Sequence, residues 1–126
     1  MNIKPVSGTL GAEIQDIDLN QNISPQEYAE IRRLLIEHEV IFFRNQDITH
    51  AQQKAFAQSF GPLQTHPSYH SIAGFPEISI LESTPEKPTK IELWHSDMSF
   101  KPKPALATLL RSRIIPPKVA THYGQA

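Results

Sequence analysis

The stretch ELWHSDMSF, residues 92–100, carries the pattern on which the fold assignment depends. It predicts a strand over residues 93–100, and side chains two residues apart in a strand leave the same face with Cα atoms about 6–7 Å apart. His95 and Asp97 are therefore predicted to converge on one ion. An imidazole and a carboxylate are two of the three ligands of a facial triad, which leaves one side of an Fe(II) ion open for a co-substrate and O2. The same short spacing also suits a hydrogen-bonded His–Asp pair with a structural role.

The chain on either side of this stretch predicts a loop and a second strand. Residues 63–90 are rich in Pro, Ser, Thr and His, which indicates a mostly irregular segment with one strand candidate at 77–81. Loops of this length often carry function. Residues 105–115 predict a strand, separated from the first by the Lys-Pro-Lys-Pro turn at 101–104.

Two helices are predicted nearer the N-terminus, each from a capping signature. Ser24, followed by Pro25 and Glu27, predicts a helix that runs to about residue 38. Thr49 and Gln52 repeat the signature, and Gly61-Pro62 indicates the stop of the second helix. The expected apolar faces are Tyr28, Ile31, Leu34 and Leu35 in the first helix, and Ala51, Ala55, Phe56 and Phe60 in the second.

Between the helices, residues 40–43 form a β-branched and aromatic run that predicts a short buried strand. The order is then a β-leaning N-terminal segment, helix, strand, helix, long loop and paired strands. This order predicts an α+β fold in a single domain over residues 1–126.

Composition excludes several classes of protein. The 12 Lys and Arg against 13 Asp and Glu form no long runs, so no nucleic-acid partner and no basic membrane anchor are predicted. The absence of cysteine excludes disulfides, zinc-thiolate sites and thiol nucleophiles. The first residues lack a signal-peptide pattern, and no apolar run approaches the roughly 20 residues that span a bilayer. A cytoplasmic protein is expected.

Several ordered motifs resemble the taurine and aryloxyalkanoate dioxygenase family. The string WHSDMSF, followed by a proline turn and PALATLLRSRIIPP, resembles the metal-binding strand pair of that family. Upstream, GTLGAEIQDIDL, HEVIFFRNQDIT and FGPLQTHPSY resemble its opening segment, its helix-to-strand passage and its first active-site loop. The resemblance covers about Gly8 to Pro117.

The resemblance implies a fold, a chemistry and a site. The expected fold is the N-terminal part of a double-stranded β-helix of the jelly-roll or cupin-like kind, with flanking helices and incomplete here. His95 and Asp97 are expected to hold Fe(II), and His66 and Tyr69 of the H-P-x-Y motif to contact an anionic substrate group. The implied co-substrates are 2-oxoglutarate and O2, and a homo-oligomer is possible for the intact parent.

The implied reaction is hydroxylation of taurine or a similar small sulfonate, with release of sulfite, succinate and CO2. Taurine-specific members have an asparagine a few residues before the metal-binding histidine, where this chain has Ile91. An aryloxyalkanoate or alkyl sulfate substrate is therefore an open alternative. A non-enzymatic anion-binding or interaction fragment is a further one.

After Pro117 the family pattern stops, and residues 118–126 read KVATHYGQA. Permitted codons for this string also encode SGDTLWAS in another frame, which resembles the expected family motif. We therefore expect a truncated domain with an out-of-frame tail or a sequencing error, exposed strand edges, poor solubility and little or no activity. The third ligand, a distal histidine, and the arginine that binds 2-oxoglutarate are expected in a missing second half. His122 has no matching motif.

Overall fold

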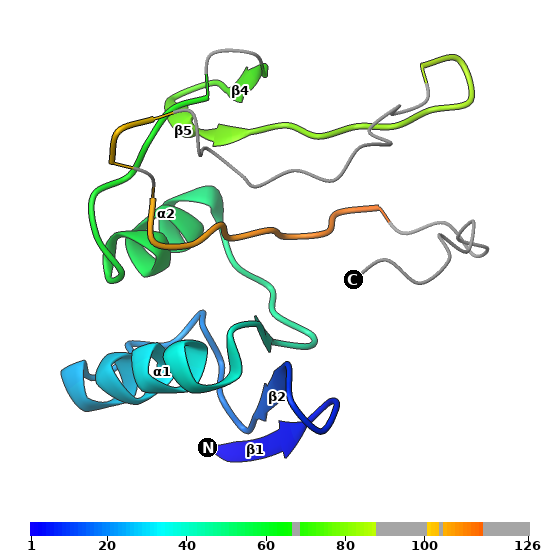
Figure 1. The fold of residues 1–126 in the computed structure, drawn as a ribbon. Helices are drawn as coiled ribbons and strands as arrows, with labels where there is room; N and C mark the ends of the chain where they lie inside the picture. The colour runs from blue at the N-terminus through cyan, green and yellow to red at the C-terminus, as the bar shows by residue number, and fades with distance from the viewer. Residues whose placement is uncertain (67–68, 88–100, 104, 115–126) are drawn as a thin grey trace.

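A three-stranded sheet and two helices form the N-terminal part of the molecule (Figure 1). The computed structural model describes residues 1–66, 69–87, 101–103 and 105–114. In the sheet, β1 (Asn2–Pro5) is antiparallel to β2 (Ala12–Gln15), with Ile3 opposite Ile14. Strand β3 (Ile41–Phe42) is parallel to β2, so the strand order is β1-β2-β3.

Helix α1 (Pro25–His38) begins where the sequence predicts. The Ser24 side chain accepts a hydrogen bond from the Glu27 backbone N–H at 3.1 Å, and the Glu27 carboxylate accepts one from the Ser24 N–H. This reciprocal pair satisfies two of the N–H groups that a helix start leaves without partners. The helix ends at His38, and the residue that follows it, Glu39, has a φ of 66° and turns the chain towards β3.

Helix α2 (His50–Gln58) also carries the predicted capping box, between Thr49 and Gln52. It ends at Gln58, before the predicted Gly61-Pro62 stop. The predicted apolar face was partly wrong, because Phe56 is buried while Ala51 and Ala55 are exposed. The reason is that α2 has one packed side, on which the rings of Tyr28, Phe43 and Phe60 surround Phe56.

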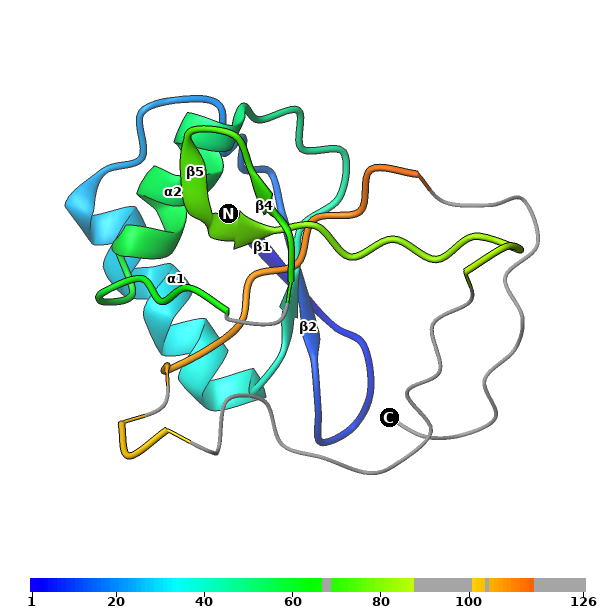
Figure 2. The same cartoon turned by 90° about the horizontal axis from the view of Figure 1, so that it is seen from above.

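One apolar core joins the sheet to both helices, and α1 lies beside the sheet in both views (Figure 1; Figure 2). Phe43 meets Phe56 edge to face, with ring centroids 5.7 Å apart. Such pairs add to the free energy gained by burying the rings. The buried members are Ile14, Leu19, Ile31, Leu34, Ile48 and Phe56.

The strand predicted at residues 40–43 is present, but it is shorter and less buried than expected. Ile41 and Phe43 pack against the core, whereas the side chains of Val40 and Phe42 are each 41% exposed. Alternate side chains of a strand leave opposite faces, and the core covers one face here. The other face carries Phe42 beside Gly11, where an added Cβ would lie 3.5 Å from the Phe42 ring.

A hairpin of β4 (Ser71–Ile72) and β5 (Phe75–Ser79) follows the second helix. The sequence placed a strand at 77–81, so the prediction was right in kind and displaced by two residues. Gly74 adopts a φ of 81° in the connecting turn, a conformation that glycine adopts at low cost. Strand β5 lies against α2, where Lys54 and Glu77 form an ion pair of 3.3 Å.

The strand predicted at 105–115 is absent from the described residues 105–114. A strand needs a neighbour to accept and donate its backbone hydrogen bonds, and no strand of the described chain pairs with this segment. Its large apolar side chains are correspondingly exposed, from 37% for Leu109 to 89% for Ile114. The companion strand predicted at 93–100 lies outside the described residues.

The mixture of helices and strands agrees with the predicted α+β class, while the double-stranded β-helix stays a prediction. Among the described helices, none has the length and apolar character needed to cross a bilayer.

Candidate functional site

The two residues predicted to bind an anionic group lie next to each other in the loop after α2. The ring centroids of His66 and Tyr69 are 4.5 Å apart, and the ring planes meet at 49°. Tyr69 is 40% exposed and His66 is partly buried, so both rings border solvent. The structure therefore brings the predicted pair together at the surface of the loop.

Packing fixes the first end of this loop. The ring of Phe60 packs edge to face on Phe56, with centroids 5.4 Å apart. Arg32 of α1 donates a hydrogen bond of 3.0 Å to the Phe60 carbonyl oxygen. The loop thus departs from a point that is attached to the core and to α1.

The second end of the loop is held by the hairpin. The Ile80 N–H donates a hydrogen bond of 2.8 Å to the carbonyl oxygen of His70. Ser71 opens β4 directly after it. The loop is therefore attached to the rest of the fold before His66 and directly after Tyr69.

An imidazole and a phenol suit an anionic ligand chemically. Each can donate a hydrogen bond, and a protonated imidazole adds positive charge. Donors to an ionised oxygen form shorter and stronger hydrogen bonds than neutral pairs do. The pair can therefore bind one end of a small anion.

The predicted iron ligands His95 and Asp97 lie outside the described residues, as does His122. Within the part of the chain that the structure describes, no three His, Cys, Asp or Glu side chains gather in a group that could hold a metal ion. The iron site stays a prediction that depends on these two residues.

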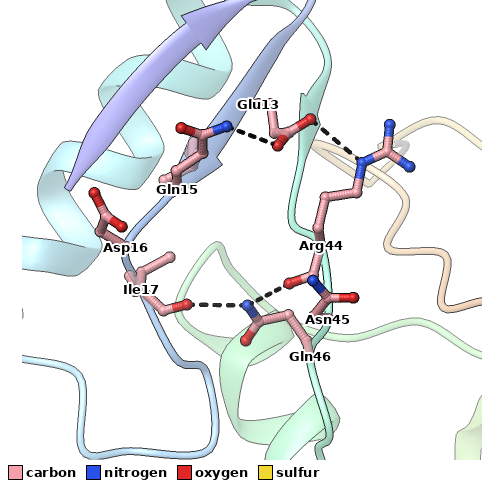
Figure 3. A pocket seen from close by; sticks show the side chains of 8 residues that line it. Glu13, Gln15, Asp16, Ile17, Arg44, Asn45 and Gln46 are labelled. Carbon is pink, nitrogen blue, oxygen red and sulfur yellow. Dashed lines mark hydrogen bonds and ion pairs between the residues drawn. The ribbon is translucent and has the colours of Figure 1, made fainter.

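A polar hollow of about 230 Å³, between the ends of β2 and β3, was not predicted (Figure 3). Gln15 donates a hydrogen bond of 3.0 Å to the Glu13 carboxylate, and Arg44 donates one of 3.3 Å. These two donors, Gln15 first, lower the pKa of the Glu13 carboxyl. The lining of the hollow also includes Asp16 and Asn45, whose backbones both have a positive φ.

Gln46 closes the other side of the hollow. Its amide nitrogen donates to the carbonyl oxygens of Ile17 and Arg44, at 3.0 and 2.9 Å, and its oxygen accepts from the Leu19 N–H at 2.7 Å. These bonds connect the segments that follow β2 and β3. The residues that line the hollow therefore form a joint between the two strands. The signal in the sequence is the polar string RNQD directly after the VIFF run.

Comparison with known proteins settles the family. A family model described as taurine catabolism dioxygenase TauD, TfdA family matches residues 2–122. The chain belongs to this family. The resemblance inferred from the motifs is thereby confirmed.

Relatives within the family carry different substrate names. The chain is 32% identical to an alpha-ketoglutarate-dependent 2,4-dichlorophenoxyacetate dioxygenase from Cupriavidus pinatubonensis, over 90% of this chain and 45% of that protein. It is also 32% identical to an alkylsulfatase from Acinetobacter baylyi, over 92% of this chain and 36% of that protein.

A solved structure of a taurine dioxygenase from Burkholderia xenovorans superposes with a TM-score of 0.55 and 41% identity, over 60% of this chain and 27% of that one. The chain spans less than half the length of each of these relatives.

Proposed function

We propose that this chain supplies iron-binding and anion-binding residues of an Fe(II)- and 2-oxoglutarate-dependent dioxygenase that acts on small organic anions. Family membership over residues 2–122 is the observation that carries the proposal. The adjacent rings of His66 and Tyr69 support the proposal, because both can donate hydrogen bonds to an anion. The relatives named above include a 2,4-dichlorophenoxyacetate dioxygenase and an alkylsulfatase, whose names indicate anionic substrates.

The proposed substrate is a sulfonate, a sulfate ester or an aryloxyalkanoate. These substrates share an anionic group joined to a chain that carries C–H bonds. The anionic group is the part that His66 and Tyr69 can hold. The apolar side chain of Ile91, near the place where taurine-specific members have asparagine, favours a substrate with an apolar tail over taurine itself. Taurine, with release of sulfite, is the competing assignment.

Each residue has a stated role in this proposal. His95 and Asp97 would hold the iron, which supplies the oxidation of a C–H bond at the expense of O2 and 2-oxoglutarate, giving succinate and CO2. His66 and Tyr69 bind the anionic end of the substrate. Binding at one end orients the C–H bond and lowers the entropic cost of reaching the reactive geometry.

Anaerobic Fe(II) titration tests the metal assignment directly. His95→Ala and Asp97→Ala are each expected to weaken Fe(II) binding at least tenfold. The control variant His38→Ala changes a histidine at the end of α1, and it should bind Fe(II) like the unchanged chain. Equal Fe(II) affinity in all four proteins would exclude His95 and Asp97 as ligands.

A substrate panel separates the proposed substrates from one another and from a non-enzymatic role. O2 uptake by the full-length protein that contains this chain is measured with Fe(II) and 2-oxoglutarate, with a medium-chain alkyl sulfate, an aryloxyacetate and taurine added in turn. Stimulation by one anion that is lost in His66→Ala and Tyr69→Phe supports the proposal. Anion binding that occurs without Fe(II) binding and without O2 uptake would instead identify an anion-binding module.

A further inference from the structure

Two pairs of facing side chains join strand β5 to helix α2, which lie beside each other in both views (Figure 1; Figure 2). In the first pair, the ring centroids of His50 and Phe75 are 5.8 Å apart. In the second, the Lys54 ammonium lies 3.3 Å from the Glu77 carboxylate. Positions four apart on a helix and two apart on a strand each share a face and are separated by about 6–7 Å along the element. The spacings therefore match, and the strand is held along the helix at two points.

The ion pair between Lys54 and Glu77 is partly shielded from solvent. The side chain of Lys54 is 32% exposed, and that of Glu77 is 21% exposed. One carboxylate oxygen of Glu77 faces Lys54, while the other is buried and has no hydrogen-bond partner among the described residues. A charge that is removed from water without a partner destabilises the structure that buries it. Lys54 is therefore the contact that allows Glu77, and with it β5, to lie against α2.

The hairpin connects this ion pair to the loop that carries the proposed anion-binding residues. The Ser71 hydroxyl donates a hydrogen bond of 3.0 Å to the carbonyl oxygen of Pro76, which directly precedes Glu77. Tyr69 lies two residues before Ser71, and its ring contacts the ring of His66. Contacts between described residues thus lead from the ion pair to both rings.

A backbone hydrogen bond makes the same connection closer to Tyr69. The Ile80 N–H, in the residue after β5, donates to the carbonyl oxygen of His70 at 2.8 Å. A displacement of β5 from α2 would therefore displace the backbone on which Tyr69 lies. We propose that Lys54 is a positioning residue, which through its ion pair with Glu77 holds Tyr69 where it can bind the anionic group of the substrate. This role rests on the proposed function, since it requires that the loop binds an anion.

Binding of butanesulfonate to the chain, measured by isothermal titration calorimetry at fixed ionic strength, tests this role. Lys54→Met removes the cation and leaves Glu77 without its partner. The dissociation constant for butanesulfonate should then rise about fivefold or more, a size typical of residues coupled in one network. A merely structural ion pair would lower the stability of the chain and leave this constant unchanged. Lys54→Arg retains the charge and should keep the constant within about twofold of that of the unchanged chain.

The nuclear Overhauser effect between the rings of His50 and Phe75 reports whether β5 still lies on α2. This signal should weaken in Lys54→Met. The double variant Lys54→Met/Glu77→Met has no unpaired charge at this contact, so both the ring signal and the affinity for butanesulfonate should recover. Affinity that falls while the ring signal is unchanged, or that stays low when the ring signal recovers, would overturn the role.

Two control variants separate the role of Lys54 from general effects. Lys4→Met removes an exposed positive charge from β1, and Ser24→Ala removes the cap of α1. Each should leave the dissociation constant for butanesulfonate within about twofold of that of the unchanged chain. A loss of affinity in Lys4→Met as large as that in Lys54→Met would show that net charge alone attracts the anion, and would overturn the role.

Glu77→Gln provides a second route if Lys54→Met does not fold. It keeps the shape of the side chain, removes the charge that pairs with Lys54, and should also raise the dissociation constant. Unchanged affinity in folded Lys54→Met or Glu77→Gln overturns the positioning role alone. Failure of the unchanged chain to bind butanesulfonate overturns the anion-binding part of the proposed function, and the positioning role with it.

Discussion

Different kinds of contact hold two regions of the chain, the N-terminal unit of residues 1–60 and the segment of residues 101–114. In the first, a shared core lies between sheet and helices, and both helices begin with a capping box. In the second, leucine and isoleucine side chains point to solvent and two side-chain hydrogen bonds, donated by Gln64 and by Arg111, attach the segment to the flanks of α2. Strand-forming composition thus gives no strand unless a partner strand is present to pair with it.

The largest expected effect lies in the core of the N-terminal unit. Ile31 is 0% exposed, so Ile31→Ala leaves a cavity and should lower the free energy of unfolding by about 2–5 kcal/mol. Urea denaturation followed by circular dichroism measures this loss. The control is Ile36→Ala on the same helix, because Ile36 is 67% exposed and its truncation should change stability by less than about 0.5 kcal/mol. Equal losses in both would contradict the assigned core.

Capping should contribute a smaller amount. Ser24→Ala removes the acceptor for the Glu27 N–H at the start of α1, and should destabilise the chain by about 1 kcal/mol. Thr9→Ala, at an exposed position outside the helices, serves as the control. Chemical denaturation of both variants checks the difference, and a Ser24→Ala variant as stable as the control would argue against the capping box.

The change in stability when Glu13 is protonated, in the joint between β2 and β3, should be smaller than the effect of the helix cap. The hydrogen bonds from Gln15 and then Arg44 hold the pKa of Glu13 below its usual value of 4.5. Because the folded pKa is depressed, this contribution to stability is present above about pH 4.5 and is lost as the pH falls through the folded pKa.

Carbon-detected NMR titration of the Glu13 carboxyl should show its pKa rising towards 4.5 in Gln15→Ala and in Arg44→Gln. Glu82→Gln, at an exposed carboxylate outside the joint, is the control and should leave the Glu13 titration unchanged. A Glu13 pKa that does not respond to Gln15→Ala would show that the two side chains do not interact in solution.

The smallest effect is expected in residues 105–114, which pair with no strand of the described chain. Leu110 is 75% exposed, so Leu110→Ser should change the free energy of unfolding by less than about 0.5 kcal/mol. The same change should raise solubility, because it removes an exposed apolar side chain. Sedimentation velocity and denaturation together measure both quantities. A loss as large as that of Ile31→Ala would show that Leu110 is buried in solution.

Local signals predicted the helices closely. The Ser24-Pro25 and Thr49 signatures placed both helix starts at the observed residues, because a capping box involves side chains and N–H groups only three residues apart. The extent of burial was harder to predict. Ala51 and Ala55 fit an apolar face by spacing, but α2 packs on the core through the side that carries Phe56, and both alanines are exposed.

In the candidate site, too, residues within one local motif were predicted, whereas contacts between distant residues were not. His66 and Tyr69 were predicted from their motif, and the structure adds that their rings lie 4.5 Å apart. The polar hollow of Glu13, Arg44 and Gln46 was missed, since it joins residues about thirty positions apart in the chain. The attachment of Arg111 to Ile48 spans 63 positions and has no local signature.

The sequence alone determined where helices begin, which family the chain belongs to and which residue types are available for binding iron and an anion. These depend on short-range hydrogen bonding and on motifs that can be read along the chain. Only the tertiary structure decided which apolar residues are buried, which side chains meet across the fold, and that residues 105–114 form no strand. These outcomes depend on contacts between distant segments, and their free energy is gained only when the partner segment is in place.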